Sequence, residues 1–375
     1  AVPPYRWDVA VSLSQIIFDW GQRSARQRVA ERETQAAGFS LSETRNNVQL
    51  VVSTAFYDVF RGQQLVAVAL ERQAAAQEQL RVARARFESD VSPRFDVIRT
   101  EAELADAQQE VIRAQNEVAL AEAAFNTALG RDVTTPVALR PEPQPVEPEV
   151  PFERAREAAI QHRPQLEALR QTIEADRQEV RARRAENKPQ VALGSTYDRP
   201  NPGGFASTPH RYNVGLTMTF PFFDSGLTRG RVREAQAITE ADRQRLEQAR
   251  QQVELDIRQA QLDAAEALKR ITTAEAEQRS ARESLRIADV RYRSGVGTNI
   301  EVTDAQVALA RAGQNLANAR FDYQVALARV EYATGVPMEA LTGAAPLPPP
   351  PGAPAPAPEA PSPRIESQPR TESST

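Results

Sequence analysis

Residues 291–306 read RYRSGVGTNIEVTDAQ and place a turn-forming cluster inside a long helical pattern rich in Ala, Arg, Gln and Glu. Residues 86–101, RFESDVSPRFDVIRTE, have the same outline 205 positions earlier. On both sides of these stretches, apolar residues recur at spacings of three and four over long segments without proline, which is typical of helices that pack lengthwise. Each stretch is therefore predicted to be the tip of a long antiparallel helical hairpin.

The two tips belong to an internal repeat that covers most of the chain. Residues 6–131 align with residues 211–336 without a gap. Each copy begins with alternating apolar and polar residues, as in WDVAVSL and YNVGLTM, which is typical of a strand with one apolar face. A register without gaps through strand, turn and helices indicates a duplication.

Equivalent turns join each strand to its long helix. Asp19 and Gly21 in the first copy correspond to Asp224 and Gly226 in the second. We expect each Asp side chain to act as the N-cap of the following helix, with the Gly allowing the chain to change direction. Trp7 and Tyr212 are also equivalent and suit a membrane interface.

The predicted fold is mainly α with a few β-strands. The second copy has a helix and a strand before residue 211 that the first copy lacks, so we expect the sequence to miss roughly the first 55–60 residues of the natural domain. The predicted division is a first repeat at 1–131 (strand 5–17, helical hairpin 22–130), a Pro-rich linker at 132–151, a second repeat at 152–336 (helix 152–188, strand hairpin 189–223, helical hairpin 227–335) and a disordered Pro-rich tail at 343–375.

Composition argues against several functions. The chain has 50 acidic and 46 basic residues, so no nucleic-acid partner is expected. It has no cysteine, and its two histidines, His162 and His210, stand apart from other ligand types and are expected on the surface. We find no nucleophile with a base, phosphate loop or metal cluster, so we expect no cofactor, no metal and no enzyme activity.

The strands need a cover for their apolar face. No apolar run is long enough for a membrane-spanning helix, whereas lipid would cover a sheet whose edges are all paired. Three or four strands are too few to close a barrel, but about four from each of three protomers give about twelve. Closure therefore predicts a homotrimer with outer-membrane lipid around a transmembrane β-barrel, and helices continuing from the strands as an α-barrel tunnel.

Four motifs in a fixed order carry a family resemblance: FDWG at 18–21, HRPQL at 162–166, FDSG at 223–226 and VGTNIEVTDAQ at 296–306. Together they resemble the outer-membrane efflux protein family, the TolC-like channels. The resemblance implies a passive channel in the cell outer membrane with a periplasmic extension. It also implies that the channel docks onto a periplasmic adaptor (membrane fusion) protein and an inner-membrane transporter. The first tip departs from the pattern, with DVSPRF where a VGT-like turn is usual.

The resemblance places Glu301 and Asp304 near the periplasmic aperture. Their equivalents in the first copy are Asp96 and Arg99. Rings of three carboxylates in a trimer would favour cations. One hypothesis is that Arg94 or Arg99 pairs with Glu301 or Asp304 across neighbouring hairpins and holds the tube closed. Ordinary helix caps and surface charges explain the same residues equally well.

The turns themselves are candidates for docking the adaptor. A glycine permits a tight turn and exposes backbone, although the turn could need Gly and Pro for its shape alone. The candidate docking residues are Val296, Gly297 and Thr298, with Val91, Ser92 and Pro93. The alternative functions are a periplasmic adaptor or a structural coiled-coil scaffold.

Overall fold

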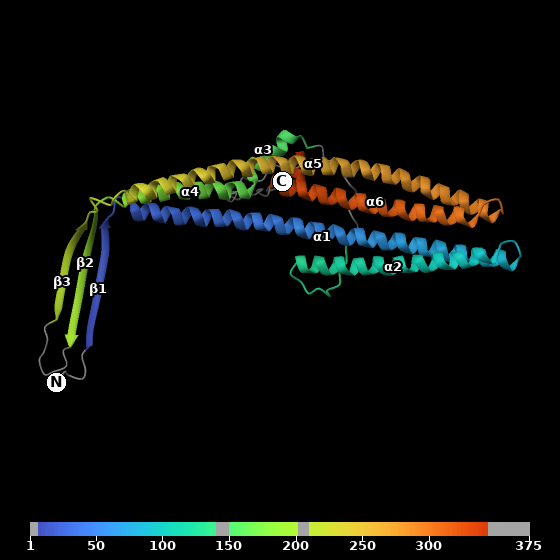
Figure 1. Cartoon of the computed structure of the whole chain (residues 1–375), viewed down its shortest axis with the longest axis horizontal. Coiled ribbons are helices and arrows are strands. Elements are labelled where there is room, and N and C mark those ends of the chain that lie inside the picture. Colours follow the sequence, from blue (N-terminus) through green and yellow to red (C-terminus); the bar gives the residue numbers. More distant parts are fainter. Residues whose placement is uncertain (1–6, 140–149, 202–209, 344–375) are drawn as a thin grey trace, which may run out of the picture.

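The computed structural model describes residues 7–139, 150–201 and 210–343, and it shows a slender molecule with one small sheet at the end of long helices (Figure 1). In chain order the elements are β1 (Trp7–Phe18), α1 (Gln22–Glu88), α2 (Arg94–Ala128), α3 (Phe152–His162), α4 (Pro164–Ala185), β2 (Gln190–Asn201), β3 (Arg211–Thr219), α5 (Leu227–Arg293), α6 (Asn299–Thr334) and α7 (Met338–Thr342). None of the helices in the described ranges is apolar over a stretch long enough to cross a membrane.

Parts of four predicted segments lie outside the described residues. They are the start of the first strand, the Pro-rich centre of the linker, the loop of the strand hairpin and the Pro-rich tail, at residues 1–6, 140–149, 202–209 and 344–375. The side chain of Trp7 also lies outside the description.

The predicted long antiparallel hairpins are confirmed. Helices α1 and α5 each contain 67 residues, which corresponds to about 100 Å at the α-helical rise. Each turns back into a shorter helix, α2 or α6, that runs along its far half (Figure 1). In proteins most of the stability of a helix comes from tertiary packing, so the lengthwise contacts within each hairpin are expected to stabilise α1 and α5.

Small residues with a heptad spacing form the seam of the first hairpin. Alanines on the two helices are buried at intervals of seven, the period of a left-handed coiled coil. These alanines are Ala69, Ala76 and Ala83 on α1 and Ala107, Ala114 and Ala121 on α2. Gly62 continues the close approach, because a Cβ at that position would lie 3.0 Å from Cγ2 of Val118. The seam therefore depends on side-chain size as well as on apolarity.

The helices form a single curved layer. In its far half the order is α2, α1, α6, α5, because α1 packs against both α2 and α6, and α6 packs against α5. Nearer the sheet, α4 lies between α1 and α5. The outer sides of α2 and α5 are thus left without a major partner among the described residues.

The three strands form an antiparallel sheet in the order β1, β2, β3. Leu13 pairs with Ser195, which pairs with Val214, so these three side chains lie on the same face of the sheet. Every second residue along each strand shares that face. That face carries the apolar side chains and they are exposed, namely Val9, Val11, Leu13, Leu193, Tyr197, Tyr212, Val214, Leu216 and Met218. The alternation seen in the sequence therefore produces a continuous apolar surface on one side of the sheet.

The turns from strand to helix use Asp19 and Asp224 differently from the predicted N-cap. The N-cap position belongs to Gly21 and Gly226, with φ of 80° and 86°. The Asp carboxylates act from two residues earlier: Asp19 accepts from the Gly21 and Arg23 amides at 3.2 and 3.1 Å. Asp224 repeats this with Gly226 and Thr228 at 3.0 and 2.9 Å. Both carboxylates still satisfy amides that the helix start leaves free.

The helix predicted at 152–188 is divided in the structure. Arg163 is extended, with φ −71° and ψ 114°, because the residue before a proline avoids the helical region. Helix α3 ends at His162 and α4 begins at Pro164. The expectation of a surface position for His162 was wrong: its side chain is buried and its Nδ1 lies 2.9 Å from the Ala158 carbonyl oxygen. His210 is exposed, as expected.

A half-buried carboxyl on α4 predicts a dependence of stability on pH. Asp176 lies beside Asp242 of α5, whose own carboxylate contacts Arg245 at 2.5 Å. Burial and the neighbouring Asp242 raise the pKa of Asp176 from 3.8 to about 6. The folded state holds this proton more tightly than the unfolded state, so the stabilisation is complete below about pH 4 and is lost as the pH rises through about 6.

We therefore expect Asp176→Asn to flatten the pH dependence of thermal unfolding between pH 4 and 7. The control Glu247→Gln removes an exposed carboxylate from α5 and should leave that dependence unchanged. Identical pH profiles for the wild-type and Asp176→Asn chains would contradict the raised pKa.

Candidate functional site at the hairpin tips

The two tips have the same backbone despite different sequences. In the second tip, the Val296 amide donates to the Arg291 carbonyl at 3.0 Å, and in the first tip Val91 donates to Arg86 at 2.9 Å. These bonds close the end of the long helix in the manner of a Schellman motif. Gly295 supplies the left-handed residue of the second tip with φ 81°. In the first tip Asp90 takes that conformation with φ 57°, which is less favourable for a residue with a Cβ.

Gly297 is required by close packing rather than by its backbone angles. A Cβ at this position would lie 2.9 Å from Cβ of Arg291 and 3.1 Å from the Tyr292 nitrogen. The next residue, Thr298, begins α6 by accepting a hydrogen bond at its Oγ1 from the Glu301 amide at 3.4 Å. The glycine therefore lets the chain cross the end of α5 before α6 starts.

We expect Gly297→Ala to destabilise the second hairpin by about 1–3 kcal/mol, because the contacting atoms are backbone and Cβ and cannot move aside. Thermal unfolding followed by circular dichroism measures this loss. The matched control is Gly230→Ala, in an open position on α5, which should be neutral or gain about 0.5–1 kcal/mol. A Gly297→Ala chain as stable as the control would contradict the steric argument.

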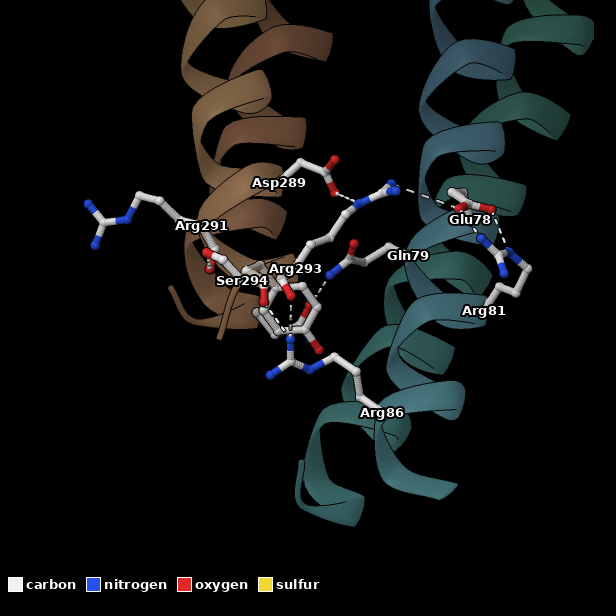
Figure 2. Close-up of polar contacts among 10 residues, drawn as sticks. Glu78, Gln79, Arg81, Arg86, Asp289, Arg291, Arg293 and Ser294 are labelled. Carbon is white, nitrogen blue, oxygen red and sulfur yellow. Dashed lines mark hydrogen bonds and ion pairs between the residues drawn. The ribbon is translucent and has the colours of Figure 1, made fainter. Parts of the chain in front are cut away.

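A contact between the tips joins the two hairpins (Figure 2). The Arg86 guanidinium lies 4.7 Å from the centre of the Tyr292 ring and donates to the Tyr292 carbonyl oxygen. Two turns earlier on α1, the Gln79 amide donates to the Asn299 side chain at 2.6 Å in a buried position. We call these four residues, Gln79, Arg86, Tyr292 and Asn299, the tip contact. They come from α1 in the first copy and from the end of α5 and the start of α6 in the second.

The tip contact is apolar around the ring and charged at its margin. Tyr292 is only 2% exposed and packs with Ala288 and Val302. Burial raises the pKa of its hydroxyl, as does the negative charge of Asp96, while the positive charge of Arg86 opposes the shift. At the margin, Arg293 lies 3.9 Å from Glu78, a longer and more exposed ion pair. The aromatic stacking and the buried amide pair therefore provide most of the attraction between the tips.

The predicted gate charges are not paired with one another within the chain. Glu301 lies 3.5 Å from Arg291 of its own hairpin. In the described part of the chain, Arg94, Arg99 and Asp304 make no ion pair within 4 Å. The Arg99 Nε atom is buried without a hydrogen-bond partner. Pairing of Arg94 or Arg99 with Glu301 or Asp304 across two different copies of the chain stays a prediction.

The predicted docking residues form the exposed ends of the two hairpins. Val296 is 75% exposed and Val91 is 62% exposed. Further apolar side chains on the first turn of each return helix extend this surface, namely Phe95, Ile98 and Ile300. Ser92 corresponds to Gly297, but its buried Oγ has no hydrogen-bond partner. The first tip therefore leaves a buried polar atom without a hydrogen bond at this position. The two tips are alike in shape and unlike in chemistry.

Sequence reasoning missed the tip contact. Its one available signal was that Arg86 and Arg291 are identical equivalents, each followed by an aromatic residue, Phe87 or Tyr292. Whether such an arginine meets its own aromatic neighbour or that of the other hairpin depends on how far the helices are offset along their axes.

The model of the family described as outer membrane efflux protein matches this chain over residues 3–131 and 155–336. The chain belongs to the outer membrane efflux protein family. The alkaline protease secretion protein AprF of Pseudomonas aeruginosa is 24% identical over 337 residues, which cover 88% of this chain and 70% of that protein. Outer membrane protein TolC of Vibrio cholerae is 23% identical over 313 residues, covering 82% of this chain and 72% of that protein.

Solved structures agree with the fold of this outer membrane efflux protein. The outer membrane protein VceC from Vibrio cholerae matches with a TM-score of 0.73 at 17% identity, covering 89% of this chain and 88% of that chain. The protein is thus an outer-membrane channel of efflux or secretion systems that extends into the periplasm. It conducts its substrates passively and is not an enzyme. The alternatives of an adaptor and a scaffold are set aside.

Proposed function

We propose that three copies of this outer membrane efflux protein close side by side into one conduit whose periplasmic end is gated by the hairpin tips. The observation that carries the proposal is that each chain has matching unpartnered sides. Exposed apolar residues remain on the outer sides of α2 and α5, namely Ile112 and Leu120 on α2 and Leu255 and Leu262 on α5. Strands β1 and β3 are the two edges of the sheet. In a head-to-tail ring, the rotation that places α2 of one copy beside α5 of the next also places β1 of one copy beside β3 of the next.

The internal repeat supports this arrangement. In a ring of alternating hairpins, the contact between the first and second hairpins of one chain is repeated between the second hairpin and the next chain. The repeat equivalent of Arg86 on Tyr292 is then Arg291 on Phe87 of the neighbouring copy. The Arg291 side chain is 52% exposed and Phe87 is 41% exposed. Both are therefore available for the equivalent stacking.

Cysteine crosslinking tests the ring directly, because the 375 residues of this chain contain no cysteine. We expect Phe87→Cys/Arg291→Cys, treated with a short bismaleimide, to give covalent dimers and trimers on denaturing gels. The matched control Arg86→Cys/Tyr292→Cys joins two positions within one chain and should remain at monomer mobility. Crosslinks confined to monomers in both variants would contradict the ring.

Gating follows from the geometry of the tips. Widening the conduit at its periplasmic end requires neighbouring hairpins to separate, and the tip contact is what holds them together. Glu301 and Asp304 lie in the first two turns of α6, and Asp96 lies in the first turn of α2. In the ring these carboxylates recur three times around the aperture and favour cations. Arg94 and Arg99 then reach Glu301 or Asp304 of the adjoining chain.

The exposed tip residues provide the docking surface for a periplasmic adaptor, through which the channel receives substrates from an inner-membrane transporter. Val91 and Val296 are the most exposed apolar residues of the two turns. A Val296→Cys chain should crosslink to a co-expressed adaptor, whereas Leu255→Cys, far from the tip, should not. The reverse pattern would place the adaptor on the side of the conduit.

A further inference from the structure

Positive charge is concentrated where the sheet meets the helices. Residues 19–30, 181–190 and 224–233 contain ten basic and three acidic residues, although the whole chain has more acidic than basic residues. The start of α1, the end of α4 and the start of α5 come together at this level (Figure 1). Glu186 of the segment after α4 ties them, lying 2.9 Å from Arg231 and 3.8 Å from Arg26.

The basic residues gathered at this level repel one another in the isolated chain. A helix N-terminus carries partial positive charge and prefers acidic neighbours, and Asp19 and Asp224 provide one such neighbour each just before α1 and α5. The first turns of the two helices add no further acidic residue. Arginine occupies the same positions in both copies, because Arg26 corresponds to Arg231 and Arg28 to Arg233. The same cluster of like charges in both copies is suited to binding an external anion.

The acidic residues of these segments are already engaged. Asp19 pairs with Arg23 at 2.7 Å, and Glu186 binds both Arg183 and Arg231. Asp224 accepts from two backbone amides. In the described ranges, Arg28, Lys188, Arg229 and Arg233 are exposed and make no ion pair within 4 Å. Their charge is therefore available to a ligand.

Exposed aromatic rings adjoin the same basic residues. Trp20, Phe222 and Phe223 are 54%, 87% and 78% exposed, in the turns that lead from the strands into α1 and α5. The Lys188 Nζ lies 5.8 Å from the centre of the Trp20 ring. Aromatic side chains with cationic neighbours are typical of the depth at which lipid headgroups begin. From this level the sheet, with its apolar face, extends away from the helices (Figure 1).

We propose that this basic collar, formed by Arg28, Lys188, Arg229 and Arg233, is a docking surface for anionic phospholipid headgroups of the leaflet that faces the helices. The inference rests on the membrane insertion of the sheet. Guanidinium groups match phosphate oxygens in a bidentate manner. The adjoining aromatic rings favour a lipid over a soluble anion, since they would otherwise stay exposed to water. Bound headgroups fix the depth of the channel and neutralise the unpaired basic side chains at the starts of α1 and α5.

The test compares binding of the purified chain to vesicles of phosphatidylglycerol and of phosphatidylcholine by flotation. We expect the wild-type chain to prefer phosphatidylglycerol, and Arg28→Gln/Arg229→Gln/Arg233→Gln to lose at least about tenfold of that preference. The control Arg279→Gln/Arg282→Gln/Arg311→Gln removes three exposed arginines near the tips and should keep the preference. The variant Arg28→Lys/Arg229→Lys/Arg233→Lys retains the charge and should retain most of it. Raising the salt concentration should reduce the wild-type preference.

The outcomes separate this inference from the proposed conduit. Equal binding to both lipids by the wild-type chain overturns the collar but leaves membrane insertion intact. Binding to neither lipid overturns both. An equal loss of preference in the test and control variants shows non-specific charge and overturns the collar. A preference that soluble inorganic phosphate abolishes at matched ionic strength shows a free-phosphate site instead. Helical circular dichroism of each variant confirms that it is folded.

Discussion

Replacing Tyr292 by alanine is expected to leave the channel open more often. The change removes the ring on which Arg86 stacks and empties a buried position between the two hairpins. Deleting a buried aromatic side chain costs about 3–5 kcal/mol. In the proposed gate only the closed state has the tip contact, so the closed state bears much of this cost. Even about 1.4 kcal/mol would raise the ratio of open to closed channels tenfold. Single-channel recording in planar bilayers measures the open fraction.

Two variants make this prediction specific. Arg86→Ala removes the other half of the stacking and should open the channel in the same direction. Tyr292→Phe is the matched control, because the buried Tyr292 hydroxyl has no hydrogen-bond partner and the ring alone carries the contact. It should conduct like the wild-type chain. Opening by Tyr292→Phe as strong as that by Tyr292→Ala, or no opening by Tyr292→Ala and Arg86→Ala, would contradict the gate.

Replacing Arg163 by alanine is expected to cause the largest loss of stability. This arginine of the HRPQL motif is 4% exposed and joins three helices at the break between α3 and α4. It donates to the Ala333 carbonyl at 3.1 Å, lies 4.5 Å from the centre of the Tyr332 ring and is 3.5 Å from Glu43. Removing one partner of a buried charged network costs about 3–5 kcal/mol, which thermal unfolding should show as a lower melting temperature.

Two comparisons isolate the role of the guanidinium. Arg163→Lys keeps the charge but loses the planar fork and should recover only part of the stability. Arg156→Ala removes a partly exposed arginine of neighbouring α3 that pairs with Glu153 and with Glu254 of α5, and it should change the melting temperature little. If Arg163→Ala melted like Arg156→Ala, the junction would not depend on this residue. Tyr332, whose hydroxyl donates to Glu43 at 2.9 Å, belongs to the same network.

The buried polar residues show the limit of sequence reasoning. His162 was expected on the surface because it had no ligand partner in sequence, yet its side chain is buried at the end of α3, and its backbone carbonyl lies close to Gly335 at the end of α6. The Asp176 and Asp242 pair and the Arg163 network likewise join residues that are far apart in the chain. The sequence around each of these residues does not distinguish it from an exposed helical residue. Its burial depends on which other helix packs against it. The HRPQL motif drew attention to this part of the sequence, but it did not predict that Arg163 joins three helices there.

The sequence by itself determined the two hairpins, their tips, the strands with one apolar face and the family. These features follow from periods of two and of three to four residues and from glycine, proline and aspartate at turns, which act over a few residues. Only the tertiary structure decided that Arg86 meets Tyr292, that Glu301 faces Arg291 and that the arginines at the starts of α1 and α5 gather around α4. The reason is physical: such contacts depend on the axial offset and order of long helices, which the many heptad-spaced alanines allow in more than one register.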